Sequence, residues 1–303
     1  MNRRERTYQV TAINLGGFDL GEADKVLYLF SAERGLQKAV AKGAKKPKSK
    51  MCGRIDPLHI NELLLACGRN FEIITEARTV ETFSELRSDF ERLSYGLYYA
   101  ELTRAFAEGR SQESSVFFDY LAAAIHLQAR QAAPSVWLCL EFEMGLLEFL
   151  GYKPELTYCL GCRQVITEYN LARFNLELGG VVCMICQRQA KRQVHEGDAE
   201  MVPDYDCQEL GRGAHLTPLV WKNLILAAES RVSTSARELL GKGEALHEPL
   251  VPPGKNIQQA WLAAQRLLRN YAEHRAGKKF RALDTLVSLP AAFEPPGLET
   301  AKN

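Results

Sequence analysis

The sequence of 303 residues contains no apolar run near the roughly 20 residues that a membrane-spanning helix needs. Its first six residues, Met1–Arg6, have no apolar stretch behind their charges, so no secretory signal is expected. These absences predict a protein of the reducing cytoplasm, where thiols stay free to bind metal instead of forming disulfides. With 46% hydrophobic and 25% charged residues, the chain has the composition of an ordinary globular protein of about two domains.

Signatures of several enzyme classes are also missing. No Gly-x-x-x-x-Gly-Lys-Ser/Thr phosphate loop occurs, because Gly241–Glu244 lacks both the upstream glycine and the hydroxyl residue. His195 and His247 each precede a glutamate but lack the second histidine of a zinc-protease helix. A Lys-x-Asp-Gly ligase nucleophile is absent as well. No catalytic residue is therefore predicted.

Four cysteines form two Cys-x-x-Cys knuckles separated by 20 residues. Each knuckle lets two thiolates face one cation, and two knuckles complete a tetrahedral Cys₄ shell with no position left for water. Between them, alternating apolar residues lead into Gly179-Gly180, which predicts a strand, a turn and a second strand. The alternative is two structural or disulfide-bonded pairs, but the spacing favours a structural zinc ribbon. The predicted Zn²⁺ ligands, for one ion per chain, are Cys159, Cys162, Cys183 and Cys186.

Positive charge is concentrated near the N-terminus, although the net charge is only +1. Residues 1–80 carry 14 Lys/Arg against 9 Asp/Glu, whereas residues 81–158 carry 6 against 12. From residue 34 to residue 54 there are eight basic residues and no acidic one. Gly43 and Pro47 interrupt this run, so it is predicted to be a loop between two strands and not a charged helix.

Alternating apolar and polar residues predict five short strands before residue 77. The predicted strands span residues 8–13, 26–30, 36–40, 58–65 and 71–76, with turns at 16–17, 33–35 and 67–70. Five such strands with a basic loop are the format of an OB-fold barrel, which binds oligonucleotides by tracking phosphates and stacking bases on aromatic rings. Among the aromatic residues, Phe18 is the best exposed candidate, whereas Tyr8, Tyr28 and Phe71 are expected mostly in the core.

The basic run is predicted to contact nucleic-acid phosphates. A solvated loop that only keeps the protein soluble is the alternative, and the barrel context favours the phosphate role. The residues of this predicted site are Arg34, Lys38, Lys42, Lys45, Lys46, Lys48, Lys50 and Arg54.

From about Phe83 the apolar residues recur at steps of three and four, which predicts helix. The first apolar stripe is Phe83, Leu86, Phe90, Leu93, Leu97 and Ala100. Further helices are predicted over 113–130, 135–150, 217–229, 233–240 and 257–276. The fold class is thus multi-domain α+β, with an OB-fold domain at 1–81, a helical domain at 82–158 and 188–289, an inserted ribbon at 159–187 and a frayed tail at 290–303.

Six short motifs occur in a fixed order over roughly residues 5–190. They are Gly21–Lys25, Ala41–Lys46, Gly53–Pro57, Leu97–Leu102, Phe117–Leu121, and Phe142-Glu143 leading to Leu150–Tyr152. Each is weak alone, but their collinear order resembles the RecO family of bacterial DNA repair and recombination mediators.

The resemblance implies an amino-terminal OB-fold, a helical domain with a zinc ribbon, and a non-enzymatic, nucleoid-associated cytoplasmic protein. It also implies binding to single- and double-stranded DNA, strand annealing, and cooperation with RecR and the single-stranded DNA-binding protein SSB so that RecA can load. Some family members lack the four cysteines, so zinc is expected to be structural. The helix start at Trp137–Glu141 lacks the basic residues that family members place there.

A partner site is predicted at the basic end of the last long helix. Between residues 266 and 281 there are six Lys/Arg against the single acid Glu273. Beside an apolar stripe, these charges suit an acidic peptide with an apolar carboxyl end, which is the character that the resemblance gives to the SSB tail. In the alternative, the apolar residues are core and the basic end is a solvated helix terminus. The predicted contact residues are Trp261, Leu268, Lys278, Lys279 and Arg281.

Two other function classes compete with the mediator. A nucleic-acid-modifying enzyme with an unrecognised site would show strand cleavage or nucleotide turnover. An RNA- or ribosome-associated zinc-ribbon protein would prefer RNA over DNA of equal length, because only RNA offers the 2′-hydroxyl.

Overall fold

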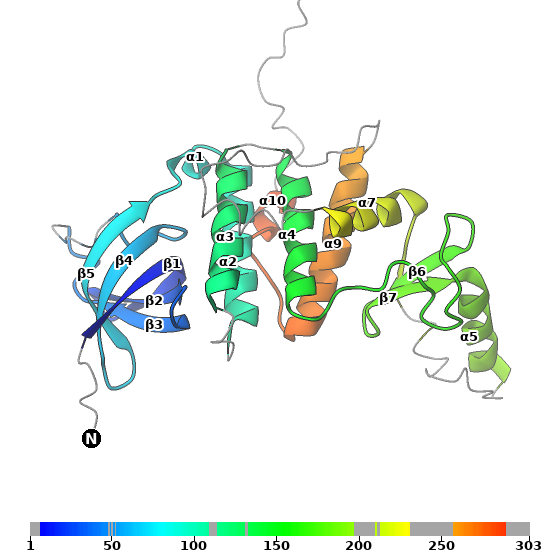
Figure 1. Ribbon diagram of the computed structural model, residues 1–303, viewed down its shortest axis with the longest axis horizontal. Helices are drawn as coiled ribbons and strands as arrows, with labels where there is room; N and C mark the ends of the chain where they lie inside the picture. Colours follow the sequence, from blue (N-terminus) through cyan, green and yellow to red (C-terminus); the bar gives the residue numbers. More distant parts are fainter. Residues whose placement is uncertain are drawn as a thin grey trace, which may run out of the picture.

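The structure is a computed structural model that describes residues 7–47, 49, 51, 53–108, 114–130, 133–196, 210, 213–230 and 257–288. Lys48, Lys50, the predicted helix at 233–240 and the predicted tail at 290–303 lie outside these residues. A barrel stands at one end of the long axis, a helical layer follows it, and a small sheet with one helix stands at the other end (Figure 1). Within the described part of the chain, none of the helices has the length and apolar character needed to span a bilayer.

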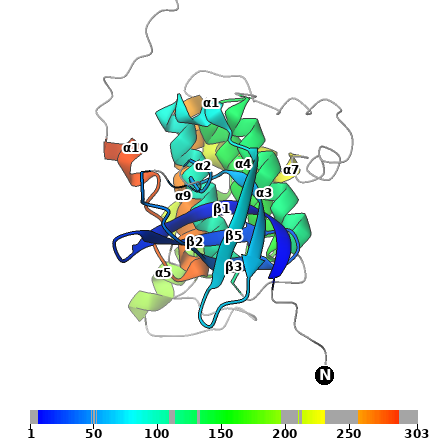
Figure 2. The ribbon, with the colours of Figure 1, turned by 90° about the vertical axis from the view of Figure 1, so that its left-hand side faces the viewer.

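Five strands form the closed barrel, which confirms the predicted OB-type domain (Figure 2). They are β1 (Thr7–Leu20), β2 (Asp24–Ser31), β3 (Gly35–Ala41), β4 (Ile60–Ala66) and β5 (Glu72–Glu81). The order is β1-β2-β3-β5-β4, with β3 and β5 parallel and the other neighbours antiparallel.

The turn predicted at Gly16-Gly17 is wrong, because β1 continues through these residues to Leu20. The strand instead bulges between Asn14 and Gly17, and the chain turns at residues 21–23. Gly16 adopts φ 103°, and a Cβ on Gly17 would lie 2.2 Å from the carbonyl oxygen of Val26. The glycine pair therefore serves a bulge and not a hairpin turn.

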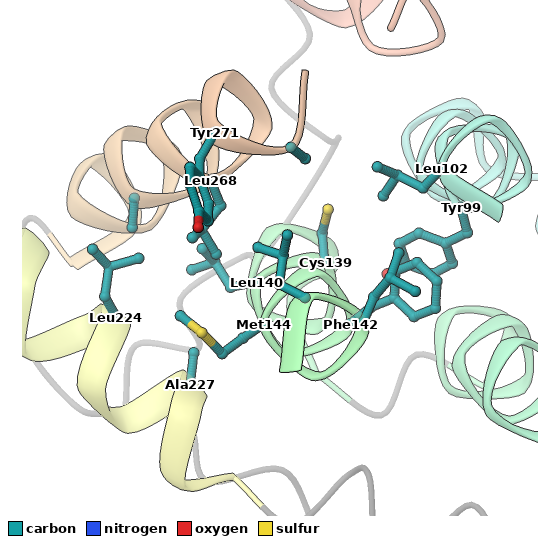
Figure 3. Packing of buried hydrophobic residues seen from close by; sticks show 14 of the residues in the cluster. Tyr99, Leu102, Cys139, Leu140, Phe142, Met144, Leu224, Ala227, Leu268 and Tyr271 are labelled. Carbon is teal, nitrogen blue, oxygen red and sulfur yellow. The ribbon is translucent and has the colours of Figure 1, made fainter. Parts of the chain in front are cut away.

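Seven helices of the described chain build the helical domain. They are α1 (Ser84–Arg87), α2 (Phe90–Phe106), α3 (Ser114–Ala129), α4 (Ser135–Phe149), α7 (Pro218–Glu229), α9 (Ile257–Ala276) and α10 (Asp284–Ser288). Helix α4 is central, with α2 on one side and α7 and α9 on the other (Figure 3). Phe142 of α4 packs on Tyr99 of α2 with ring centroids 4.2 Å apart, while Met144 faces α7.

The single helix predicted from Phe83 is two helices in the structure. Phe83 precedes α1 in a left-handed conformation (φ 48°), and Asp89 then caps α2 by accepting a hydrogen bond from the backbone N–H of Arg92. This restart rotates the apolar stripe, so Phe90 is 53% exposed where burial was predicted. Tyr95, Tyr98, Tyr99, Leu102 and Phe106 are among the residues that α2 buries.

The barrel packs against the helical domain through the outer face of its first strands. Phe30 of β2 meets Phe117 of α3 edge to face, with ring centroids 5.0 Å apart. The hydroxyl of Ser114 donates to the carbonyl of Ala32 at 2.9 Å. Ile13 and Leu15 of β1 belong to the same buried cluster as the helical core. A shared core thus joins the two domains.

The predicted strand-turn-strand unit between the cysteine knuckles is confirmed. It consists of β6 (Leu171–Asn175) and β7 (Gly180–Cys183), and α5 (Met184–Glu196) begins within the second knuckle. A third strand, β8 (Ala214–His215), pairs with β6 and was not predicted. The hairpin is held on α9, because Phe174 packs edge to face on Tyr271 and Arg275 donates to the carbonyl of Glu177 at 2.9 Å.

Candidate nucleic-acid interface and metal centre

The basic loop that follows β3 has a fixed backbone at its start. The backbone N–H of Gly43 donates to the Asp24 carboxylate at 2.7 Å, and that of Lys45 donates to the carbonyl of Ala23 at 3.0 Å. Ala44 is buried in the barrel core. These contacts hold the loop against the turn between β1 and β2. The exposed side chains of Lys42, Lys45 and Lys46 therefore extend from an ordered backbone, and we call this segment the lysine loop.

The three lysines of this loop differ in their partners. Lys45 forms a 2.8 Å ion pair with Asp19, and the hydrogen bond from Lys45 holds the pKa of the Asp19 carboxyl below its usual range. Lys42 and Lys46 form no ion pair with any residue that the structure describes. Two of the three cations are therefore free for phosphates, and the third must exchange one carboxylate for another anion.

The rest of the predicted basic site is spread along β3. Strand β3 runs from Gly35 to Ala41, so its length of about 20 Å, at 3.3 Å per residue, lies between Arg34 and the lysine loop. The guanidinium carbon of Arg34 lies 3.6 Å from the ring centre of Tyr8. Lys38 lies between these ends and is exposed.

Arg54 has a structural contact, since its guanidinium donates to the carbonyl of Ala77 at 2.8 Å. The structure thus gathers Lys42, Lys45 and Lys46 in one loop, places Arg34 and Lys38 along β3, joins Arg54 to β5, and does not describe Lys48 or Lys50.

The aromatic residues of the barrel divide much as predicted. Phe18 is 44% exposed, and Tyr8 is buried. Tyr28 and Phe71 are half-buried. The Tyr28 ring lies 6.0 Å from the Phe18 ring, so one exposed and one half-buried ring stand together on the outside of the barrel.

A cavity of about 450 Å³ opens beside β3 and the loop between β4 and β5, a loop that lines the ligand face of OB-folds. Its lining includes the cations Lys38 and Arg69 and the acids Glu72 and Glu108. This mixed charge gives the cavity no net preference for phosphate. The lysine loop is therefore the stronger phosphate site.

The four predicted metal ligands come together. The Sγ atoms of Cys159, Cys162, Cys183 and Cys186 all lie within 4.8 Å of one another. Cys159, Cys183 and Cys186 are buried, whereas Cys162 is exposed. A donor set of four sulfur atoms within this distance fits a structural Zn²⁺ ion.

The protein environment favours a cation among these thiols. Burial raises the pKa of the Cys159 thiol, but backbone N–H groups of Cys162, Cys183 and Gly161 outweigh burial and bring that pKa below its usual value. Burial and the neighbouring Cys159 raise the pKa values of Cys183 and Cys186. Four thiolates this close repel one another, and a divalent metal ion removes that repulsion.

The backbone around the knuckles leaves little spare room. A Cβ on Gly161 would lie 3.0 Å from Cys186 Sγ and 3.3 Å from a methyl of Leu210. The indole of Trp221 on α7 donates to the carbonyl of Leu156 at 2.9 Å. This bond attaches the segment that precedes the first knuckle to α7. The ligands are therefore positioned by packing on both sides.

The predicted partner site on α9 is only partly at the surface. Trp261 and Leu268 are buried, so they cannot form its apolar wall (Figure 3 shows Leu268 facing α4). The Trp261 ring packs 5.6 Å from that of Trp137, and its indole donates to Asn223 at 3.1 Å. The apolar stripe of α9 therefore completes the helical core, which was the alternative interpretation.

The three basic residues of that predicted site are exposed after the end of α9. Lys279 forms a 2.5 Å ion pair with Glu273, a carboxylate that also accepts from Arg269. A cavity of about 350 Å³ lies beside them, and Leu176 is its apolar member. Lys278 and Arg281 thus form no ion pair with any described residue, whereas Lys279 must release Glu273 before it can bind another anion, and Leu176 replaces Trp261 and Leu268 as the apolar neighbour.

Comparison with known families and proteins agrees with these parts. A family model described as Recombination protein O N terminal matches residues 4–83, and one described as Recombination protein O C terminal matches residues 87–203. A DNA repair protein RecO from Desulforamulus reducens is 37% identical over 62% of this chain and 72% of its own length. One from Synechococcus sp. (strain JA-2-3B'a(2-13)) is 30% identical over 93% of this chain and 90% of its own. One from Gloeobacter violaceus is 28% identical over 96% and 98%.

Proposed function

The chain belongs to the RecO family, and from this membership we propose that it is a DNA repair and recombination mediator that acts by binding and not by catalysis. The observation that carries the proposal is the anchored lysine loop, in which the free cations Lys42 and Lys46 stand beside a closed OB-type barrel. Phosphate neutralisation by such cations releases condensed counterions and is independent of sequence. The protein is therefore proposed to bind both single- and double-stranded DNA.

Strand annealing is the proposed consequence of this binding. A protein that screens the phosphates of one strand without covering its base edges leaves those edges free to pair with a complementary strand. The proposed partners are RecR and SSB, with which the protein prepares SSB-coated strands for RecA. The proposed location is the cytoplasm, at the nucleoid.

The proposed cofactor is one structural Zn²⁺ per chain, held by the four cysteines within 4.8 Å of one another. Four thiolate ligands leave no open coordination position, so the ion would contribute folding free energy and no chemistry. Protein purified without chelators should contain one equivalent of zinc, and replacing Cys159 and Cys162 with serine should loosen the ribbon. A zinc content far below one equivalent would contradict this assignment.

The proposed SSB-tail site is the exposed basic group of Lys278, Lys279 and Arg281. Carboxylates of an acidic tail would accept charge-assisted hydrogen bonds from these residues, and its apolar end would contact Leu176 in the adjoining cavity. This relocates the apolar contact from the buried Trp261 and Leu268.

The deciding experiment compares single-stranded DNA, duplex DNA and RNA of equal length by fluorescence anisotropy, with magnesium and nucleotide present in a parallel series. The mediator proposal predicts binding to both forms of DNA without cleavage or nucleotide turnover. Cleavage or turnover would indicate a nucleic-acid-modifying enzyme, and a clear preference for RNA would indicate an RNA-associated protein.

A further inference from the structure

The outer face of β2 changes from buried to open along the strand. Phe30 lies under α3, against Phe117. Tyr28, two residues earlier and so on the same face, is only half-buried. Phe18 on the neighbouring strand β1 lies beside Tyr28 and is 44% exposed. The barrel thus presents a ledge of two aromatic rings where its outer face emerges from beneath the helical domain.

Cations from both domains surround this ledge. Lys38 pairs directly with Tyr28 across β2 and β3, and its Nζ lies 5.5 Å from the Tyr28 ring centre. From the helical domain, the guanidinium carbon of Arg104 near the end of α2 lies 4.5 Å from the same centre. Tyr28 is therefore flanked by one cation from each domain.

Two acidic residues lie close to Arg104 in the chain, Glu101 one helical turn before it on α2 and Glu108 just after the helix. Of the nearby acids, Glu101 already accepts the backbone N–H groups of Arg281 and Ala282 at 2.9 and 3.0 Å. Glu108 lines the cavity that Lys38 also lines, so it offsets part of the positive charge of the ledge.

We propose that one site for single-stranded DNA spans both domains at this ledge and is formed by Phe18, Tyr28, Lys38 and Arg104. This seam site rests on the proposed function and extends it to the helical domain. An exposed ring stacks on an unpaired base, which a duplex cannot offer without unstacking, and the flanking cations contact the adjoining phosphates. The seam site therefore gives the protein a preference for single strands. The lysine loop contacts only phosphates and does not provide this preference.

Phe18 is the stacking residue of the seam site, because it is the exposed ring. Tyr28 lies beside it with ring centres 6.0 Å apart, and Lys38 and Arg104 lie close to the Tyr28 ring. Charge also favours nucleic acid over a protein partner here, since two of the four residues are cationic and the other two are aromatic. Loss of RecR binding with DNA binding intact would instead assign the ledge to a protein.

The chain offers a matched control for each substitution. Phe90 is an exposed phenylalanine, 53% accessible, at the start of α2 and therefore at the opposite end of that helix from Arg104. Arg130 is an exposed arginine just after α3, at the end of the α2–α3 pair where Arg92 donates to the carbonyl of Gln128. Neither control touches the barrel ledge.

The test measures anisotropy of labelled single-stranded and duplex oligonucleotides at several salt concentrations. Phe18→Ala should weaken single-strand binding about tenfold and leave duplex binding unchanged, while Phe18→Trp retains it. Arg104→Gln should reduce the slope of log K against log salt for single strands by about 0.7. Phe90→Ala and Arg130→Gln should match the wild type.

The outcomes separate this inference from the proposed function. Wild-type binding to DNA with both ledge variants equal to their controls would overturn the seam site alone. An equal loss of single-strand and duplex binding in Phe18→Ala would overturn the stacking role. Failure of the wild type to bind DNA at all would overturn the proposed function itself.

Discussion

The ion pair between Lys45 and Asp19 leads to different expected effects for the three lysines of the lysine loop. Lys42 and Lys46 are free among the described residues, whereas Lys45 pairs with Asp19 at 2.8 Å. Each lysine that contacts a single-strand phosphate adds about 0.7 to the slope of log K against log salt. Lys42→Ala and Lys46→Ala should each lower that slope by about 0.7, or about 1.4 together.

Lys45→Ala should lower the slope by less than either neighbour, because Asp19 already neutralises part of its charge. An exposed ion pair of this kind is weak because water screens it, so a phosphate can compete with it. Asp19→Asn should therefore strengthen DNA binding and steepen the slope, and the added Lys45→Ala change should reverse that gain. Replacing all five lysines between residues 42 and 50 should flatten the slope by up to about 3.5.

Anisotropy titrations of a single-stranded oligonucleotide between 50 and about 300 mM salt supply the slopes, with duplex DNA in parallel. Arg78→Ala is the matched control, because Arg78 is an exposed barrel cation that pairs with Glu62 on β4. Equal slopes for all lysine variants and the wild type would show that the loop is a solvated segment that contacts no phosphate. An identical loss from Lys45→Ala and Lys42→Ala would refute the role given to Asp19.

Three further predictions concern the metal centre, the core and the partner site. Gly161→Ala should weaken zinc retention against a chelator, because the new Cβ would lie 3.0 Å from Cys186 Sγ; retention equal to the wild type would contradict the packing described. Burial raises the pKa of Glu143 to about 8, so between pH 4.5 and 8 the folded state binds more protons than the unfolded state. Stability should fall by about 1 kcal/mol per pH unit over that window, and denaturant titrations of Glu143→Gln should show a flatter dependence; parallel curves would refute it. A triple glutamate variant of Lys278, Lys279 and Arg281 should lose affinity for a labelled SSB tail peptide, and unchanged affinity would place that site elsewhere.

Local sequence signals predicted the elements that are built from local interactions. The cysteine spacing and the apolar alternation ending at Gly179-Gly180 predicted the ribbon hairpin, because knuckle geometry and turn conformation depend on a few adjacent residues. Alternation likewise predicted the five barrel strands. The lysine loop was predicted from Gly43, Pro47 and the absence of acids.

Features that depend on tertiary packing were not predictable in the same way. The stripe of Trp261 and Leu268 has the same spacing whether it faces a partner or a core, and only the position of α4 shows that it is core. The break between α1 and α2 lies at Ser88 and Asp89, where Asp89 caps α2, and the apolar steps of three and four continue across it. Arg104 reaches Tyr28 only because α2 ends beside the barrel, so no motif could have placed it in a nucleic-acid site.

The measurement that tests the central claim most directly is annealing of fluorescently labelled complementary strands coated with SSB. The wild type should accelerate duplex formation without nucleotide hydrolysis, and the Lys42→Ala/Lys46→Ala variant should be slower, with the difference shrinking as salt rises. The Arg78→Ala control should anneal at the wild-type rate. A wild type that leaves the annealing rate of SSB-coated strands unchanged, while binding zinc and folding normally, would contradict the account.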